Sequence, residues 1–107
     1  MRKEIKQCSS LDEVRSNIDQ IDKQLISLIA ERSNYVDQAS QFKKNMQDVA
    51  DSQRVETIIA KMKNLAVEHD LDTIIIEKIY RTMIGAFIEY EAQQVSPIYR
   101  EIKQSYY

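Results

Sequence analysis

The sequence predicts an all-α fold with three helices in the order long, short, long. Apolar residues recur every three or four positions over most of the chain, capping residues stand where such stretches begin, and the chain has one Gly and one Pro. Multi-hairpin β folds and Gly-rich phosphate loops need several turn residues, so both are excluded. At 107 residues we expect one domain over 1–107, with a core of about 9–94 and a C-terminal tail over 97–107.

The first helix is predicted over residues 11–43. Residues 10–13 form an S-x-x-E capping box, which satisfies free backbone N–H groups at a helix start. Beyond it, a heptad seam alternates spacings of four and three: Val14, Ile18, Ile21, Leu25, Leu28, Arg32, Tyr35, Ala39 and Phe42. Such a helix spans roughly 50 Å, whereas a compact monomer of this size has a radius of gyration near ~13 Å. Its apolar face must therefore meet another chain, and we expect an interlocked homodimer with two-fold symmetry.

Two further helices are predicted after residues 45–50, where the apolar period is lost and a loop is expected. Asp51 is a good N-cap for the shorter helix, which runs to about residues 69–70. Asp72 is placed to cap the last helix, whose apolar stripe continues until Pro97 ends or kinks it.

Composition and charge exclude several functions. Hydrophobic residues make up 43% of the chain and charged residues 30%, and no apolar run is long enough to span a bilayer. The first residues lack the apolar stretch of a secretory signal, and a net charge of −2 does not suggest nucleic-acid binding. One His and the lone Cys8 cannot supply a structural zinc site, and Cys8 cannot form an internal disulfide. We therefore expect a cytoplasmic protein with no membrane, metal or nucleic-acid partner.

Two cations break the pattern of the first helix. Arg32 lies in the seam where the period requires Leu, and Lys43 follows eleven residues later. In one helix the two side chains are within about 20° in phase and ~16 Å apart along the axis, so they could hold a small ligand with anionic groups at both ends. Taken alone, Arg32 would be a register-setting or snorkelling residue, and Lys43 a solvated cation favoured at a helix end.

Two more arginines border the apolar faces. Arg15 adjoins the seam, but roughly 42 Å of helix separates it from Lys43, too far for one small ligand within a protomer. In an antiparallel pairing of two first helices, Arg15 could enter the partner's site. Arg54 follows Asp51 by three residues; it is either a surface ion pair with that Asp, which contributes little, or a planar fork for a carboxylate.

One carboxylate lies on the apolar face of the last helix. Glu91 follows Phe87 by four residues, which places both on the same face. A buried carboxyl group tends to remain protonated unless a cation is near, and a protonated Glu91 would donate a hydrogen bond. The alternative is that Glu91 lies at the edge of the stripe, in water.

The spacing of these residues resembles the all-α chorismate mutase family over residues 9 to about 94. The pattern reads Leu11-x-x-Val14-Arg15-x-x-Ile18-Asp19-x-Ile21-Asp22-x-x-Leu25-x-x-Leu28-x-x-Glu31-Arg32, then Lys43, Asp51-x-x-Arg54 and Glu91. The resemblance implies an intertwined dimer in which each site is built mostly from one protomer and Arg15 comes from the other. It also implies a pericyclic reaction of a small dianionic substrate, with no cofactor.

The resemblance further implies a role for each site residue. Arg32 of the same protomer and Arg15 of the partner subunit would bind the substrate carboxylates. Lys43 would bind the ether oxygen whose bond to carbon breaks. Protonated Glu91 would donate to that oxygen from the opposite side. The residues expected to shape the pocket are Asp51, Arg54, Val55 and Phe87.

Within the family, residues 8–11 and 34–43 look like segments of isochorismate pyruvate lyase. Val55 stands where dedicated bacterial mutases commonly carry a Glu for the substrate hydroxyl, whereas the lyase does not. Glu91 stands where the lyase and many mutases have Gln and some mutases have Glu. The expected activity is therefore conversion of isochorismate to salicylate and pyruvate, with weak chorismate mutase activity. A dedicated mutase forming prephenate is the alternative, and a non-catalytic helical dimer is a third.

Overall fold

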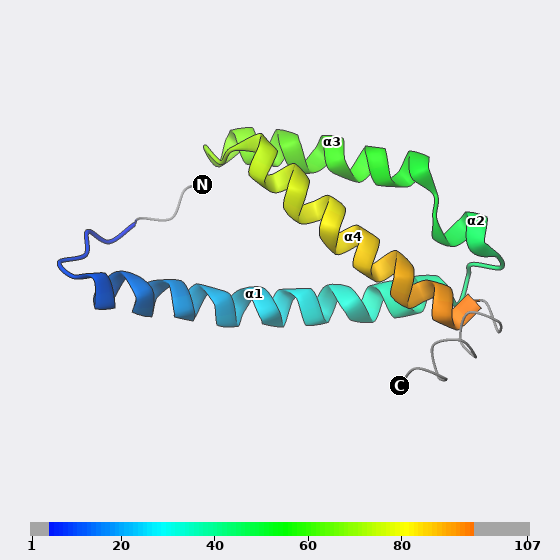
Figure 1. The fold of residues 1–107 in the computed structure, drawn as a ribbon, viewed down its shortest axis with the longest axis horizontal. Helices are drawn as coiled ribbons and strands as arrows, with labels where there is room; N and C mark the ends of the chain where they lie inside the picture. Colours follow the sequence, from blue (N-terminus) through cyan, green and yellow to red (C-terminus); the bar gives the residue numbers. More distant parts are fainter. Residues whose placement is uncertain (1–4, 96–107) are drawn as a thin grey trace. The chain divides into compact units, whose positions relative to one another are not determined.

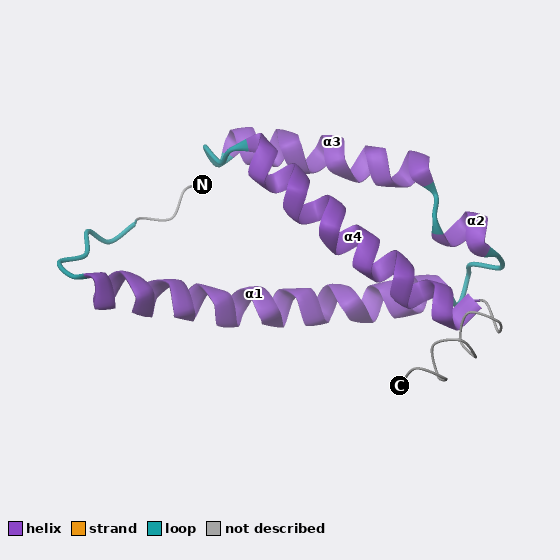
Figure 2. Cartoon of the chain, viewed as in Figure 1, coloured by secondary structure: helices purple, strands orange, loops and turns teal. Residues whose placement is uncertain are grey.

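The computed structural model describes residues 5–95, except for the side chains at positions 46, 47, 94 and 95. Within that range the chain contains no strand, and its helices are α1 (Leu11–Ser40), α2 (Met46–Val49), α3 (Ser52–Glu68) and α4 (Thr73–Val95) (Figures 1 and 2). The predicted all-α class and the long, short, long order are confirmed. The single turn α2 is an addition, because a loop was expected there. The predicted helix stop at Pro97 and the tail over 97–107 lie outside the described residues.

The chain divides into two compact units, Met1–Tyr35 and Val36–Tyr107, with the boundary inside α1. The expectation of a single domain stays a prediction. No helix in the described part of the chain is long and apolar enough to cross a membrane.

In the first unit, α1 begins at the predicted capping box. The Ser10 hydroxyl oxygen accepts a hydrogen bond from the N–H of Glu13 at 3.1 Å. The Glu13 carboxylate in turn accepts hydrogen bonds from the N–H and the hydroxyl of Ser9 at 3.1 and 2.9 Å. In a standard capping box it would accept from the N–H of the next residue, Ser10. These hydrogen bonds lower the pKa of Glu13, and the one from the Ser9 backbone has the largest effect.

The seam of α1 is uncovered in this chain. None of the residues of α1, all of which the structure describes, is buried. The seam positions Ile18, Ile21, Leu25 and Leu28 are 48–60% exposed. A helix of 30 residues, about 45 Å long, thus keeps a continuous apolar stripe that is available for packing.

In the second unit, α1 ends three residues earlier than predicted, at Ser40. The Ser40 hydroxyl donates to the carbonyl of Asp37 at 2.6 Å, and the next three N–H groups bond three residues back instead of four. Lys43 N–H, for example, donates to the Ser40 carbonyl at 3.3 Å. Lys43 therefore follows the helix, and the argument that places it on one helical face with Arg32 was wrong.

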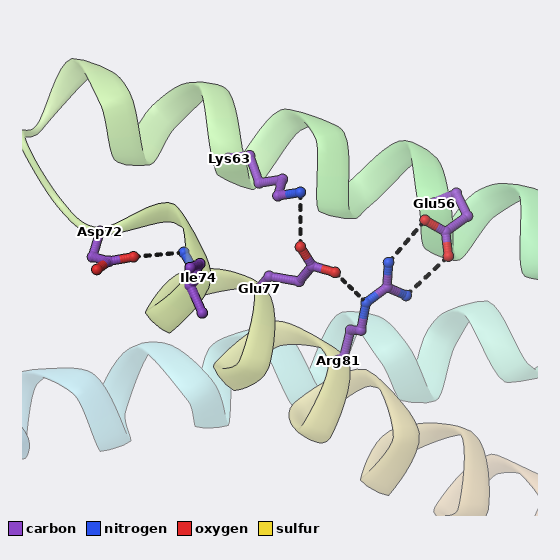
Figure 3. A network of polar contacts seen from close by, with 6 residues as sticks. All are labelled: Glu56, Lys63, Asp72, Ile74, Glu77 and Arg81. Atoms are coloured by element: carbon purple, nitrogen blue, oxygen red, sulfur yellow. Dashed lines mark hydrogen bonds and ion pairs between the residues drawn. The ribbon is translucent and has the colours of Figure 1, made fainter.

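The helices α3 and α4 pack together as a hairpin (Figure 1), with Ile59, Ala66, Ile84 and Ala92 among the buried apolar residues. Both predicted caps are confirmed. Asp51 caps α3, and Asp72 Oδ1 accepts the N–H of Ile74 at 2.8 Å at the start of α4 (Figure 3). The hairpin turn includes Asp70 in the left-handed region, with φ of 52°.

Four exposed or partly exposed charges join α3 to α4 (Figure 3). The two terminal nitrogens of Arg81 donate hydrogen bonds to the Glu56 carboxylate at 2.9 and 3.0 Å. Its Nε donates one to the Glu77 carboxylate at 2.8 Å. Lys63 Nζ lies 2.7 Å from the other Glu77 oxygen. The hydrogen bonds from Lys63 and then Arg81 lower the pKa of Glu77 from 4.5 to about 2.

This network predicts an acid-sensitive part of the stability. The folded-state pKa of Glu77 is depressed, so its contribution is complete above pH 4.5 and is lost as the pH falls toward about 2. We expect Glu77→Gln to lower the thermal unfolding midpoint slightly at pH 7 and to flatten its decline between pH 4.5 and 2. Glu68→Gln, at the exposed end of α3, is the control. Equal declines in wild type and Glu77→Gln would contradict the assignment.

Candidate functional site

The two residues expected to carry the chemistry lie in direct contact. Lys43 Nζ donates a hydrogen bond to Glu91 Oε2 at 2.6 Å, although 48 positions separate them in the sequence. Glu91 is buried, with 4% of its surface exposed, whereas 27% of the Lys43 side chain is exposed. The alternative that Glu91 lies in water at the edge of the stripe is therefore wrong. The pair combines a buried acceptor with a cation that still reaches the surface.

Glu91 is buried because it belongs to the apolar face of α4. Ile84 lies two turns before it on the same face, and Ala92 follows it; both are buried. An unpaired carboxylate in such surroundings is costly, and one charged hydrogen bond from Lys43 offsets part of that cost. The turn that follows α1 supplies the cation that stabilises the carboxylate of Glu91 at this place.

The segment after Lys43 is more ordered than the sequence suggested. Asn45 Oδ1 accepts the N–H of Asp48 at 3.0 Å, and the Asp48 carboxylate accepts the N–H of Lys44 at 3.0 Å. This reciprocal capping holds the single turn α2, whose Val49 is buried and which packs against α4. Sequence reasoning missed this turn, although the spacing of Asn45 and Asp48 is that of a capping box.

Asp51 has a structural task at the start of α3. Its Oδ1 accepts the backbone N–H of Arg54 at 3.1 Å, in an extended N-cap conformation. This hydrogen bond uses the backbone N–H of Arg54 and does not involve its guanidinium group. Arg54 is exposed and the adjacent Val55 is half-buried, both in the first turns of α3. A role for these residues in binding substrate stays a prediction.

The predicted site residues fall into both units of the chain. The structure brings Lys43 and Glu91 together, and Phe87 lies one turn before Glu91 on α4. Arg15 and Arg32 belong to the first unit, where both lie on α1; Arg15 is exposed and Arg32 is half-buried. Their meeting with Lys43 around one ligand stays a prediction.

A second pair beside the site was not anticipated from the sequence. Interaction with the carboxylate of Asp37, in the last turn of α1, raises the pKa of Tyr90, the neighbour of Glu91. A carboxylate is disfavoured at a helix C-terminus, because the helix dipole is negative there. An Asp at that position was the one signal in the sequence that could have indicated a partner outside the helix.

Among the described residues, no group of three or more His, Cys, Asp or Glu side chains lies close enough to hold a metal ion. The chemistry available at the site is that of an ammonium group and a carboxyl group, which can stabilise developing charge and exchange a proton.

Comparison with known proteins places this chain in a family. Residues 14–92 match the chorismate mutase type II family, and the chain therefore belongs to it. The isochorismate pyruvate lyase of Pseudomonas aeruginosa is 28% identical over 81 residues, covering 76% of this chain and 80% of that protein. The chorismate mutase of Methanocaldococcus jannaschii is 32% identical over 75 residues, covering 69% and 76%. The family resemblance is confirmed, and it supports an enzyme acting on a small substrate.

The capping role of Asp51 predicts separate effects of two substitutions. Asp51→Ala should lower the free energy of unfolding by about 1 kcal/mol, because the Arg54 N–H loses its acceptor. Asp51→Asn keeps an acceptor and should remain near wild-type stability in urea unfolding. If Asp51→Ala unfolds at the wild-type urea midpoint, the cap contributes nothing. If Asp51→Asn is stable but loses activity, the carboxylate also serves the substrate.

Proposed function

We propose that this protein is a cofactor-independent pericyclic enzyme that converts isochorismate to salicylate and pyruvate, with weak chorismate mutase activity. The observation that carries the proposal is the contact between Lys43 and the buried Glu91, because it sets a partly exposed cation against a buried carboxyl group. Val55 beside Arg54, and the similarity to an isochorismate pyruvate lyase, favour the lyase.

A dedicated chorismate mutase is the second candidate. It is favoured by the carboxyl group at position 91 and by the similarity to a protein named chorismate mutase. A non-catalytic helical module is the third, and it is disfavoured because such a module has no need of a lysine and a buried carboxylate held together at one site.

Catalysis of either reaction consists of folding a flexible dianion into its reactive conformer and stabilising charge on the departing ether oxygen. Lys43 binds that oxygen. Arg32 of the same protomer and Arg15 of the partner subunit hold the two carboxylates as planar, bidentate donors. Arg54 shapes the pocket and adds positive charge to it.

Glu91 changes state when the substrate arrives. Without ligand its carboxylate accepts a hydrogen bond from Lys43. When Lys43 turns to the ether oxygen, that partner is lost, and a buried carboxylate beside a dianion is strongly disfavoured. Glu91 therefore takes up a proton and donates it in a hydrogen bond to the ether oxygen, so substrate binding is coupled to proton uptake.

The second subunit is part of the proposal. The exposed seam of α1 needs a cover, and in the second unit Leu65, Leu71, Ile75 and Ile79 are also 43–51% exposed. Apolar surface on this scale marks an interaction site. A homodimer covers it with a second copy of the same surfaces and brings Arg15 into reach of the neighbouring site.

One assay distinguishes the three candidates. Purified protein is incubated separately with isochorismate and with chorismate, and the products are identified by chromatography. Salicylate and pyruvate formed from isochorismate faster than prephenate from chorismate support the lyase. Faster formation of prephenate replaces it with the mutase, and no product from either substrate leaves the non-catalytic module.

Lys43→Ala should lower kcat by roughly 10²–10³-fold, the cost of removing one preorganised donor from a developing oxyanion. Lys44→Ala is a matched control, because the Lys44 side chain is exposed and only its backbone N–H takes part in the cap. Both variants are assayed with the preferred substrate. Turnover within a few-fold of wild type in Lys43→Ala would remove that lysine from the mechanism.

Proton uptake at Glu91 predicts that activity falls as the pH rises. Glu91→Gln carries a permanent donor and should flatten this fall, whereas Glu89→Gln, on the same helix, should keep the wild-type slope. The measurement is kcat/KM between pH 5 and 9, a range in which Glu77 is already ionised. A wild-type profile without slope, or an equal slope in Glu91→Gln, would contradict the role.

A further inference from the structure

We propose that Asn45 and Asp48 are positioning residues, whose reciprocal hydrogen bonds form a clip that holds the backbone next to Lys43. This inference rests on the proposed function for its catalytic consequence, since it concerns how the lysine of that site is presented. The clip acts through Lys43 and makes no contact with the substrate.

The backbone of Lys43 is weakly held on its N-terminal side. The Lys43 N–H donates to the Ser40 carbonyl at 3.3 Å, in a bond that reaches three residues back. Such bonds have poorer geometry than those of an α-helix, and Phe42, the residue before Lys43, is 82% exposed. A lysine side chain is also long and flexible. The position of Lys43 therefore depends on contacts made after it in the chain.

The clip holds the chain directly after Lys43. The N–H of Lys44 donates to Asp48 Oδ2 at 3.0 Å, and the N–H of Asp48 donates to Asn45 Oδ1 at 3.0 Å. A third bond, from the N–H of Val49 to the carbonyl of Asn45 at 3.3 Å, closes the same turn. The segment is thus folded into one compact turn that begins at the residue following Lys43.

Val49 fixes this turn to the helix that carries Glu91. Its side chain is buried, with 3% of the residue exposed, and α2 packs against α4. The Nζ of Lys43 meets the same helix, at 2.6 Å from Glu91 Oε2. Both the backbone beside Lys43 and the tip of its side chain are therefore placed with reference to α4.

The clip contributes a defined chain path more than it contributes stability. The helix α2 has four residues, too few to be stable as an isolated helix. Asn45 and Asp48 are both exposed, so a looser loop at this place could bond to water instead. What the two side chains add is one fixed conformation of the chain between Lys43 and α3.

The clip and the ion pair differ during the proposed reaction. Lys43 leaves Glu91 for the ether oxygen, so the contact that holds the tip of its side chain opens. The clip uses the backbone N–H groups of Lys44 and Asp48 and no reacting group, so it stays closed. It then limits how far Lys43 moves, and a displacement of about 1 Å can cost up to ~10²-fold in rate.

The kinetic test removes each side-chain acceptor of the clip and then restores it. Asp48→Ala and Asn45→Ala should each lower kcat by about tenfold with KM within about twofold, because the arginines that bind the carboxylates are kept. Asp48→Asn and Asn45→Ser keep an acceptor and should retain most of the wild-type kcat. Asp72→Ala is the control, because it removes a comparable cap at the far end of α4 and should leave kcat unchanged.

Amide hydrogen exchange tests the clip without any activity. In Asp48→Ala, exchange should become several-fold faster at the amide of Lys43, which bonds to no residue of the clip, as well as at the amide of Lys44. Asp48→Asn and Asp72→Ala should exchange at the wild-type rate at both amides. A protein inactive on both substrates would end the proposed function, whereas exchange at Lys43 would still test the clip.

Four results would overturn the inference. The first is unchanged exchange at the amide of Lys43 in Asp48→Ala. The others concern an active enzyme: a wild-type kcat in both alanine variants of the clip, a kcat in Asp48→Asn as low as in Asp48→Ala, or an equal loss of kcat in Asp72→Ala.

Discussion

The structure of the second unit is organised by the need of one buried carboxylate for a cation. Glu91 lies on the apolar face of α4, where its charge is tolerated only with a partner. Lys43 supplies that partner from a turn beyond α1, and the capped turn α2 follows at once and packs against α4. The same contact underlies the proposed chemistry. In that proposal the substrate draws Lys43 away from Glu91, and a proton on Glu91 replaces the lost positive charge.

The second constraint is the uncovered seam of α1. A 30-residue helix without a buried residue does not stabilise itself, since most helical stability in proteins comes from packing. In the proposed homodimer the apolar stripe is covered, and the same helix carries Arg32 for one site and Arg15 for the other. Assembly and catalysis then depend on one surface, so changes that weaken the dimer also weaken the site.

The sequence predicted the elements that local patterns determine. Capping at Ser10, Asp51 and Asp72 follows from short-range rules of capping, and the position of Glu91 on the apolar face of α4 follows from periodicity, whereas its burial was left open. The end of α1 was placed too late because Phe42 continues the apolar period. The hydrogen bond from the Ser40 hydroxyl, which accompanies the observed end of the helix, cannot be recognised from the spacing of apolar residues. The contact between Lys43 and Glu91, which lie 48 positions apart, forms only when the turn after α1 meets α4, and no short-range rule predicts it.

The central claim is that cations from two subunits surround one dianion, and mixing two inactive variants tests it most directly. Arg15→Ala and Lys43→Ala are purified separately, then unfolded and refolded together. In the mixture half of the dimers contain both chains, and each of those has one intact site of two, so activity should rise to about a quarter of wild type. A mixture no more active than the separate variants, with mixed dimers present by mass spectrometry, would contradict the account.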